Sequence, residues 1–201
     1  IRREPCSLYG SVGSDCRYGG GIHCKAVDDV VYFTSAKVGD SPLFAVNAKG
    51  DVREVTTASG SVDCFDVAAG RCVAVCMRGL GLEEVYAIDL MGGAETCLTD
   101  WNGAFVRTHS AVEPKPLFFV NDEAQTVSGW VMEPLGYDPQ KRYPAIFDIH
   151  GGPKGTYGPI YYHEMQVWAQ RGYFVFFCNP RGSDGHGDVY SRIMTLNGTK
   201  D

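Results

Sequence analysis

Residues 144–153 read PAIFDIHGGP, and this stretch decides the interpretation of the second half of the chain. A short apolar run with a breaker at each end is typical of a buried strand, predicted here over residues 144–149. The His-Gly-Gly-Pro at residues 150–153 suits a loop that brings backbone N–H groups close to another group, because glycine has no side chain in the way. An ordinary strand-to-helix turn uses the same residue types, so this loop alone leaves both interpretations open.

The residues that follow predict a helix and a second strand. Residues 161–172 carry apolar side chains at helical spacing and end in Gly172, which suits the position just past a helix. The apolar positions are Tyr161, Met165, Trp168 and Ala169. Residues 173–178, YFVFFC, are continuously apolar, as expected for a strand in a parallel sheet that helices cover. With the glycine-rich NPRGSDGHG at residues 179–187, the order of elements predicts one βαβ unit.

These motifs, in this order, resemble the prolyl oligopeptidase family of serine peptidases, and most closely its acylaminoacyl-peptidase and dipeptidyl-peptidase-like branch. The segments that carry the resemblance are HGGP at 150–153, HEMQ at 163–166, GY at 172–173 and NPRGS at 179–183. The resemblance covers residues 115–201 and, more loosely, the residues before them. It implies a β-propeller joined to an α/β-hydrolase domain with a Ser-Asp-His triad, which cleaves short or N-terminally modified peptides through an acyl-enzyme.

The resemblance also implies roles for the His-Gly-Gly residues. The backbone N–H of Gly152, with Gly151 beside it, would donate a hydrogen bond to the oxyanion that forms during acyl transfer. His150 would shape the loop by hydrogen bonding, since relatives that carry tyrosine there use the tyrosine hydroxyl for the oxyanion contact. We expect no cofactor, and the five histidines show no His-x-x-x-His spacing for a metal.

Arg181 is the candidate substrate-binding residue. It follows the carboxyl end of a predicted strand, and this edge of an α/β sheet is where ligands bind. Its guanidinium would either clamp a carbonyl or carboxylate of a peptide substrate or tie down the glycine loop. The sequence leaves both interpretations open.

A Gly-x-Ser-x-Gly motif is missing from the sequence. The nucleophile of an α/β-hydrolase needs that motif, because only a sharp turn exposes its hydroxyl above the sheet. Ser183 comes closest, but Arg181 stands where the first glycine should be. In the family the triad lies further along the chain, so we expect an internal piece of a longer enzyme that is inactive by itself.

The first half of the chain is repetitive. Three pairs of segments align at offsets of 42 or 43: residues 43–50 with 85–92, 55–56 with 98–99, and 30–33 with 73–76. A period of 40 to 50 residues built from short strands is typical of β-propeller blades. We therefore expect the C-terminal blades of a propeller, about two, over residues 1–112, and the N-terminal part of an α/β-hydrolase domain, truncated before the nucleophile, over residues 113–201.

Two further segments have a structural interpretation. Pro114-Lys115-Pro116 predicts a linker between the two parts, and a hairpin is expected over residues 118–133 with its turn at Asn121-Asp122-Glu123. Glu83-Glu84 is interpreted as a solvated charge pair that enters a strand. The resemblance offers an alternative, because dipeptidyl peptidases of the family hold a substrate amino terminus with a glutamate pair.

Composition bounds the class of protein. The net charge of −6 argues against a nucleic-acid partner, and no apolar stretch is long enough to cross a membrane. The eight cysteines include no Cys-x-x-Cys pair and fall mostly in apolar strands, so we expect reduced, buried thiols and a cytoplasmic protein. Cys72 and Cys76 should share one face of a strand, because they are four residues apart.

Three functions remain open at this stage. The favoured one is a fragment of a serine peptidase with a peptide substrate. The alternative is a non-catalytic, propeller-type binding module, or one subunit of a split hydrolase. A lipase or esterase shares the His-Gly-Gly loop but predicts no propeller repeats. Since two blades alone expose strand edges, we expect self-association or pairing with the missing remainder of the peptidase.

Overall fold

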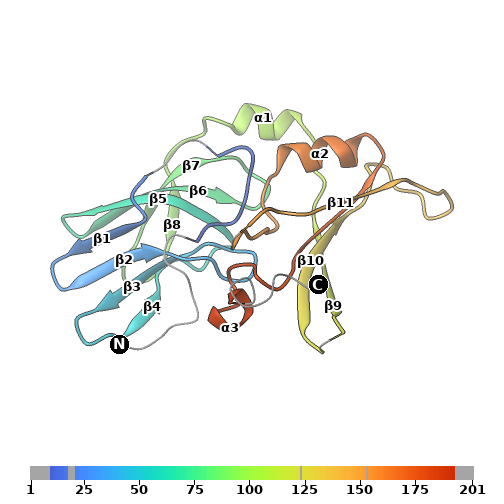
Figure 1. Ribbon diagram of the computed structural model, residues 1–201. Coiled ribbons are helices and arrows are strands. Elements are labelled where there is room, and N and C mark those ends of the chain that lie inside the picture. The colour runs from blue at the N-terminus through green and yellow to red at the C-terminus, as the bar shows by residue number, and fades with distance from the viewer. Residues whose placement is uncertain (1–9, 18–20, 123, 153, 193–201) are drawn as a thin grey trace.

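The structure is a computed structural model that describes residues 10–17, 21–122, 124–152 and 154–192 (Figure 1). Its strands form three four-stranded sheets. Three residues on which sequence-based predictions fell, Cys6, Glu123 and Pro153, lie outside the described residues, as does the start of the chain. Among the described residues, no helix is both long and apolar enough to cross a membrane.

Two of the sheets are antiparallel throughout and follow the order of the chain. The first blade sheet consists of β1 (Cys24–Val27), β2 (Val30–Thr34), β3 (Leu43–Asn47) and β4 (Val52–Glu54). The second blade sheet consists of β5 (Gly60–Ala68), β6 (Arg71–Arg78), β7 (Glu84–Ile88) and β8 (Glu95–Cys97). This connectivity is the one expected of the two predicted propeller blades.

The sequence repeat is also a repeat of hydrogen bonds. The Leu43 N–H donates to Thr56 Oγ1 at 2.9 Å, and the Val85 N–H donates to Thr99 Oγ1 at the same distance. Val46 pairs with Val52 in the first blade sheet, whereas the equivalent pair in the second, Ile88 with Glu95, is separated by one more residue. The change of offset from 42 to 43 therefore arises from one extra residue in the β7–β8 turn.

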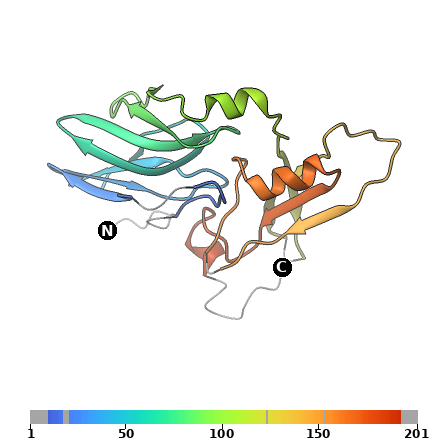
Figure 2. The ribbon, with the colours of Figure 1, turned by 90° about the horizontal axis from the view of Figure 1, so that it is seen from above.

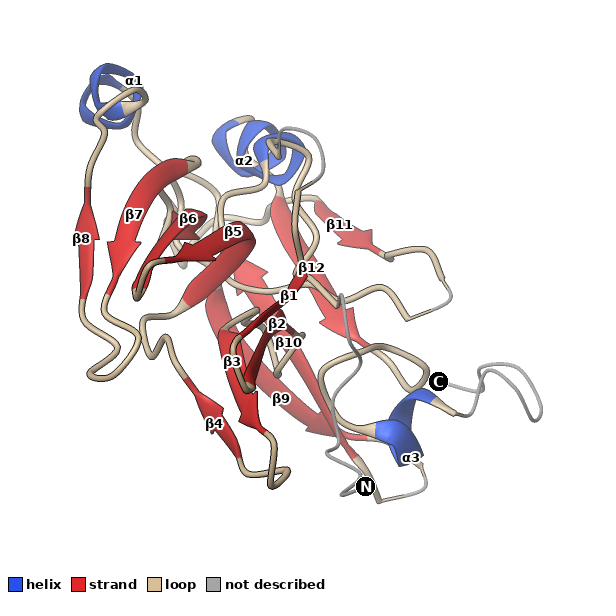
Figure 3. Cartoon of the chain, turned by 90° about the vertical axis from the view of Figure 1, so that its left-hand side faces the viewer, coloured by secondary structure: helices blue, strands red, loops and turns tan. Residues whose placement is uncertain are grey.

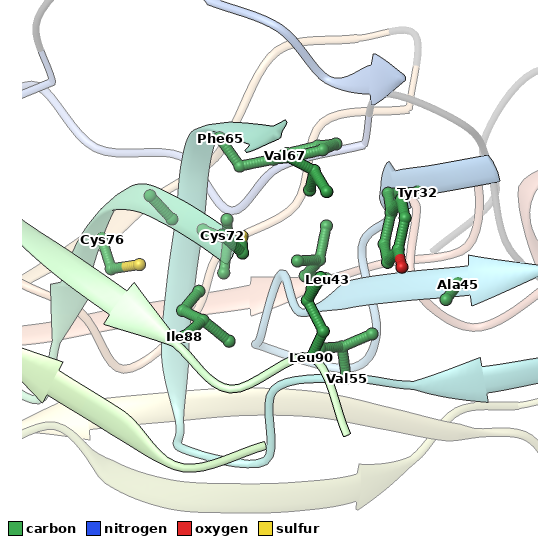
Figure 4. Close-up of a cluster of buried hydrophobic side chains, with 12 residues drawn as sticks. Tyr32, Leu43, Ala45, Val55, Phe65, Val67, Cys72, Cys76, Ile88 and Leu90 are labelled. Atoms are coloured by element: carbon green, nitrogen blue, oxygen red, sulfur yellow. The ribbon is translucent and has the colours of Figure 1, made fainter. Parts of the chain in front are cut away.

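One hydrophobic cluster joins the two blade sheets, and Figure 4 shows it in close-up. Its most buried members come from both sheets, as Leu43, Val62 and Cys76 show by their complete burial. The full set is Tyr32, Leu43, Ala45, Val55, Val62, Phe65, Val67, Cys72, Ala74, Cys76, Ile88 and Leu90. Because neither sheet has a core of its own, the two blades stabilise each other by burying this shared face.

The cysteines only partly follow the prediction. Cys72 and Cys76 point from the same face of β6 into the cluster, as expected. The expectation that most thiols are buried was wrong: Cys97 is exposed on the outer strand β8, and three others are half-buried. All seven described cysteines are free thiols.

The third sheet, the mixed sheet, has the strand order β11-β12-β10-β9. Its strands are β9 (Lys115–Val120), β10 (Thr126–Met132), β11 (Ala145–Asp148) and β12 (Phe174–Asn179). The parallel pair β11–β12 is joined by α2 (His163–Gln170), which is the predicted βαβ unit. Figure 2 shows α2 lying over one face of this sheet. The cluster buried between them includes Met165 from the helix and Trp130 and Val175 from the sheet.

Two predictions about the mixed sheet were wrong. The strand over residues 145–148 is not buried, because β11 is an edge strand and α2 covers only one face; Phe147 remains 59% exposed. The predicted linker is not a linker either, since Lys115 and Pro116 belong to β9 and pair with Val131 and Trp130 of β10. A proline fits there because β9 is the other edge strand, where one backbone N–H needs no partner.

Two short helices were not predicted, α1 (Gly103–Thr108) and α3 (Asp188–Ser191). In Figures 1 and 3, α1 and α2 lie at one end of the molecule and α3 at the other. The sequence pattern for both is weak, because each spans fewer than two turns and has no side-chain cap hydrogen bond.

Glu84 also departs from the prediction, because its carboxylate is not a solvated charge. It accepts hydrogen bonds from the Thr99 hydroxyl and from the backbone N–H groups of Trp101, at 3.1 Å, and Asn102, at 2.7 Å. Burial raises the pKa of Glu84, but these hydrogen bonds outweigh burial and leave the pKa below its ordinary value of 4.5. The carboxylate thus anchors the segment that leads into α1.

Candidate functional site

Two glycine-rich loops meet at one edge of the mixed sheet. The parallel strands β11 and β12 end at the same edge, so the loops that follow them are neighbours. We call residues 149–158 the His-Gly-Gly loop and residues 179–187 the Asn-Pro-Arg loop. They differ in exposure, because Gly151 and Gly152 are exposed whereas Asn179 and Ser183 are almost completely buried.

Asn179 ties the two loops together through its side-chain amide. Its Oδ1 accepts from the Tyr157 N–H at 2.7 Å, and its Nδ2 donates to the Tyr157 carbonyl at 2.9 Å. The Tyr157 hydroxyl donates to Asp148 Oδ2 at 2.9 Å. Burial, followed by this hydrogen bond, raises the pKa of Tyr157, so the hydroxyl keeps its proton and remains a donor.

His150 makes a second connection between the loops. Its Nε2 lies 2.9 Å from Ser183 Oγ, and its Nδ1 lies 3.0 Å from the Gly151 carbonyl oxygen. The Ser183 hydroxyl is also within 2.7 Å of the Pro180 carbonyl. The imidazole packs edge-on against the Tyr157 ring, with the ring centroids 5.1 Å apart. The ring is therefore held on three sides.

Gly155 allows the His-Gly-Gly loop to fold back onto His150. A Cβ at this position would lie 2.5 Å from the Gly151 carbonyl oxygen and 2.8 Å from His150 Nδ1. Both distances are shorter than real Cβ contacts, so any side chain would push the imidazole away from the Gly151 carbonyl. A glycine is thus required at position 155, because the backbone there lies against His150 and the Gly151 carbonyl.

The exposed glycines present backbone donors to solvent. The N–H groups of Gly151 and Gly152 donate no hydrogen bond to any described residue. Gly151 lines a cavity of about 430 Å³ whose wall also includes Ile149 and Tyr162. The opposite wall comes from the N-terminal segment, residues 10–17, through Ser11 and Ser14.

The N-terminal segment is hydrogen-bonded to the βαβ unit. The Gly13 N–H donates to the Thr156 carbonyl at 2.8 Å, next to the His-Gly-Gly loop. The Asp15 carboxylate accepts from the N–H groups of His163, at 2.6 Å, and Glu164, at 2.9 Å, and so caps α2 from a distant part of the chain. These contacts place the cavity between the propeller part and the sheet edge.

Arg181 faces a different cavity. Its side chain is only 4% exposed and lines a space of about 450 Å³ together with Asp148, Ile149 and Cys178. Asp148 and Ile149 also line the first cavity, so the two spaces flank β11 where it ends. Gly151 lines the first cavity and Arg181 lines only the second, so the structure does not place them in one cavity.

Ser183 and His150 are paired like a nucleophile and its base, but the geometry does not suit that use. Ser183 is 1% exposed, so its hydroxyl has no access to a substrate carbonyl. No cluster of three or more His, Cys, Asp or Glu side chains that could hold a metal occurs in the described ranges. The chemistry that remains is electrostatic, from the free backbone donors of the glycines.

Residues 159–201 match the profile of the prolyl oligopeptidase family. The chain is a relative of this family. Over 107 residues, or 53% of the chain, it is 42% identical to an uncharacterized peptidase, YuxL, of Bacillus subtilis, and the match covers 16% of that protein. The profile match includes two of the segments that carry the resemblance, HEMQ at 163–166 and NPRGS at 179–183.

Solved structures agree on the fold. An acylaminoacyl peptidase of Pyrococcus horikoshii superposes with a TM-score of 0.75 and 31% identity, over 85% of this chain and 27% of the other. A dipeptidyl peptidase 4 of Porphyromonas gingivalis shares the fold, with a TM-score of 0.72 and 16% identity, over 96% of this chain and 27% of the other. These likenesses confirm the predicted fold class. The chain spans about a quarter of the length of these peptidases.

Sequence reasoning missed two residues that build the site. Asn179 stands in the NPRGS motif, yet its role in holding Tyr157 is visible only when the two loops are placed together. Asp15 left no signal at all, because its partners are 148 and 149 residues away. A polar residue at the end of an apolar strand, such as Asn179, was the one available hint.

Proposed function

We propose that the protein is a serine peptidase of the prolyl oligopeptidase family that hydrolyses short or N-terminally modified peptides, and that this chain supplies part of the oxyanion hole. The observation that carries the proposal is that Gly151 and Gly152 are exposed and that their N–H groups donate to no described residue. Gly151 lines a cavity at the carboxyl edge of the sheet. The match of residues 159–201 to the prolyl oligopeptidase profile supports the reaction class.

In the proposed reaction a serine hydroxyl attacks the substrate carbonyl carbon while a base takes its proton. The carbonyl oxygen becomes an anion, and the Gly152 N–H donates to it from a backbone already held in place. Collapse of this intermediate breaks the C–N bond, the amine leaves with a proton, and water hydrolyses the acyl-enzyme. Because Ser183 is buried and the sequence has no Gly-x-Ser-x-Gly motif, the proposal takes the nucleophile and its base from residues outside this chain.

Arg181 has a place in this proposal as well. Its guanidinium lines the cavity on the far side of β11, where it can bind a substrate carboxylate or carbonyl that reaches past the strand end. Its burial supports an equal part in holding the Asn-Pro-Arg loop. Neither role needs a cofactor.

The test uses the full-length protein with chromogenic peptide anilides, one series N-acetylated and one with a free amino terminus. We expect hydrolysis, covalent labelling by a fluorophosphonate probe, and loss of both on mutation of the labelled serine. Gly152→Pro removes the N–H and should lower kcat by about 10²- to 10³-fold with little change in KM. Gly152→Ala keeps the N–H and should retain much more activity.

A full-length protein that neither hydrolyses any of these anilides nor reacts with the probe would contradict the proposal. A non-catalytic module would then be favoured. The exposed apolar side chains on the face of the mixed sheet away from α2, among them Phe119 and Phe147, favour a further polypeptide over this face. If labelling appears only after a second polypeptide is added, the protein is a subunit of a split hydrolase.

A further inference from the structure

His150 and Ser183 make three close contacts, but in their neutral forms they have only two protons to share among these contacts. Three close contacts are present: Gly151 O to His150 Nδ1 at 3.0 Å, His150 Nε2 to Ser183 Oγ at 2.9 Å, and Ser183 Oγ to the Pro180 carbonyl at 2.7 Å. A neutral imidazole offers one N–H and a hydroxyl offers one O–H. Three arrangements are therefore available, one for each contact that is left without a proton. The one that leaves His150 Nε2 and Ser183 Oγ without a proton between them sets two lone pairs 2.9 Å apart. The other two place a proton there, and they differ in whether Gly151 receives a hydrogen bond.

In the first of these two arrangements the Ser183 hydroxyl donates to His150 Nε2. The imidazole then carries its proton on Nδ1 and donates it to the Gly151 carbonyl oxygen. In the second, Ser183 donates to the Pro180 carbonyl and accepts from Nε2–H. The bare Nδ1 then faces the Gly151 oxygen with no proton between them, so the carbonyl is no longer held.

The Gly151 carbonyl matters because it shares a peptide group with the Gly152 N–H. The peptide group is planar and trans, so its C=O and N–H point in opposite directions and rotate together. A hydrogen bond from His150 to the carbonyl oxygen therefore fixes the direction of the Gly152 N–H. No other described group donates a hydrogen bond to the Gly151 carbonyl oxygen.

We propose that Ser183 is a positioning residue: by donating to His150 Nε2, it keeps the imidazole proton on Nδ1 and so aims the Gly152 N–H at the oxyanion. This inference rests on the proposed function for its catalytic consequence. Ser183 suits the role because it is 1% exposed, so water cannot compete for its hydroxyl. The Tyr157 ring keeps the imidazole in the plane that both hydrogen bonds require.

The kinetic test is a double-mutant cycle in the full-length protein. Ser183→Ala removes the donor to Nε2 and should lower kcat about tenfold, less than loss of an oxyanion donor, with KM unchanged. His150→Asn places an amide N–H near the Nδ1 position, where it can reach the Gly151 oxygen without help from Ser183. In that background Ser183→Ala should change kcat by less than about twofold.

Ser191→Ala is the matched control, since Ser191 is also a buried serine after the same strand and its hydroxyl makes only a 3.4 Å contact. It should leave kcat unchanged. An equal effect of Ser183→Ala in the His150 and His150→Asn backgrounds would overturn the proposal. So would a kcat of Ser183→Ala within twofold of wild type.

A crystal structure of the full-length Ser183→Ala protein tests the device without relying on activity. We expect the Gly151 carbonyl to leave His150 Nδ1, with the Gly151–Gly152 peptide plane rotated, while Ser191→Ala keeps the wild-type plane. An unrotated plane in Ser183→Ala would refute the positioning role. If the wild-type protein proves inactive, the proposed function fails, but this measurement still decides whether Ser183 holds the peptide.

Discussion

The blade sheets and the mixed sheet are stabilised in different ways. Each blade strand pairs with its neighbour in the chain, and the two blade sheets bury one shared cluster. In the mixed sheet, β12 lies between β10 and β11 and is joined to neither of them by a hairpin turn. The face of this sheet away from α2 carries exposed apolar side chains. The difference shows that local repeats build the scaffold, whereas contacts between distant residues build the site.

The largest expected effect is a difference in stability between a substitution in the blade sheets and one in the mixed sheet. Leu43→Ala deletes a completely buried side chain of the shared cluster and should lower the free energy of unfolding by about 3 kcal/mol. Phe147→Ala, on the exposed face of β11, should cost less than about 1 kcal/mol. Urea unfolding of the two variants measures both values. A cost for Phe147→Ala as large as that of Leu43→Ala would show that the face is covered in solution.

The next effect concerns the contacts that join the two loops. Asn179→Ala removes the side chain that satisfies both backbone groups of Tyr157, and should lower the free energy of unfolding by about 2 kcal/mol because those groups stay buried. Asn47→Ala, in the exposed β3–β4 turn, serves as the control and should cost clearly less. Equal losses in thermal or urea unfolding would mean that Asn179 does not hold the loops.

A smaller effect compares the two blade sheets with each other. Thr56→Val and Thr99→Val remove equivalent hydroxyls that accept from a β-strand N–H. Thr56 is completely buried, so Thr56→Val should lower the free energy of unfolding by about 1.5 kcal/mol. Thr99 is half-buried, so Thr99→Val should lower it by about 0.5 kcal/mol. Urea unfolding decides the order. A greater loss for Thr99→Val would mean that its contact with Glu84 outweighs its place in the repeat.

The smallest effect depends on pH and concerns Glu84. Its pKa in the folded protein lies below 4.5, so its carboxylate stabilises the fold fully above that ordinary value. This contribution is lost as the pH falls through the lowered pKa. The difference in free energy of unfolding between wild type and Glu84→Gln should therefore shrink between about pH 6 and about pH 3. A difference that stays constant over this range would contradict the role given to the carboxylate.

Much of the fold could be predicted because its signals are local. The strand repeat that includes Thr56 and Thr99 is formed by residues close together in the chain. The same is true of the apolar spacing before Gly172 that predicts α2. The burial of residues 145–148 was predicted wrongly for a physical reason. Apolar composition shows that a strand can be buried, but not whether a neighbouring element covers it.

The candidate site could be predicted only in part. The glycines that expose backbone donors carry a recognisable pattern at residues 150–152. The contacts that hold those donors do not, because His150 and Ser183 are 33 residues apart and meet only when β11 and β12 pair. Glu84 was misread for the same reason, since its hydrogen-bond donors, Thr99, Trp101 and Asn102, come from the far side of a hairpin.

The cap that Asp15 places on α2 has a consequence for the timing of synthesis. Tyr162, the N-cap residue before this helix, makes no side-chain cap hydrogen bond, and the eight-residue helix is too short to be stable alone. Asp15 leaves the ribosome 148 residues before its partner His163, a delay of roughly 10 s at ordinary elongation rates. During that interval Asp15 has no partner in α2, so this contact between the propeller part and the βαβ unit can form only after the helix has been synthesised.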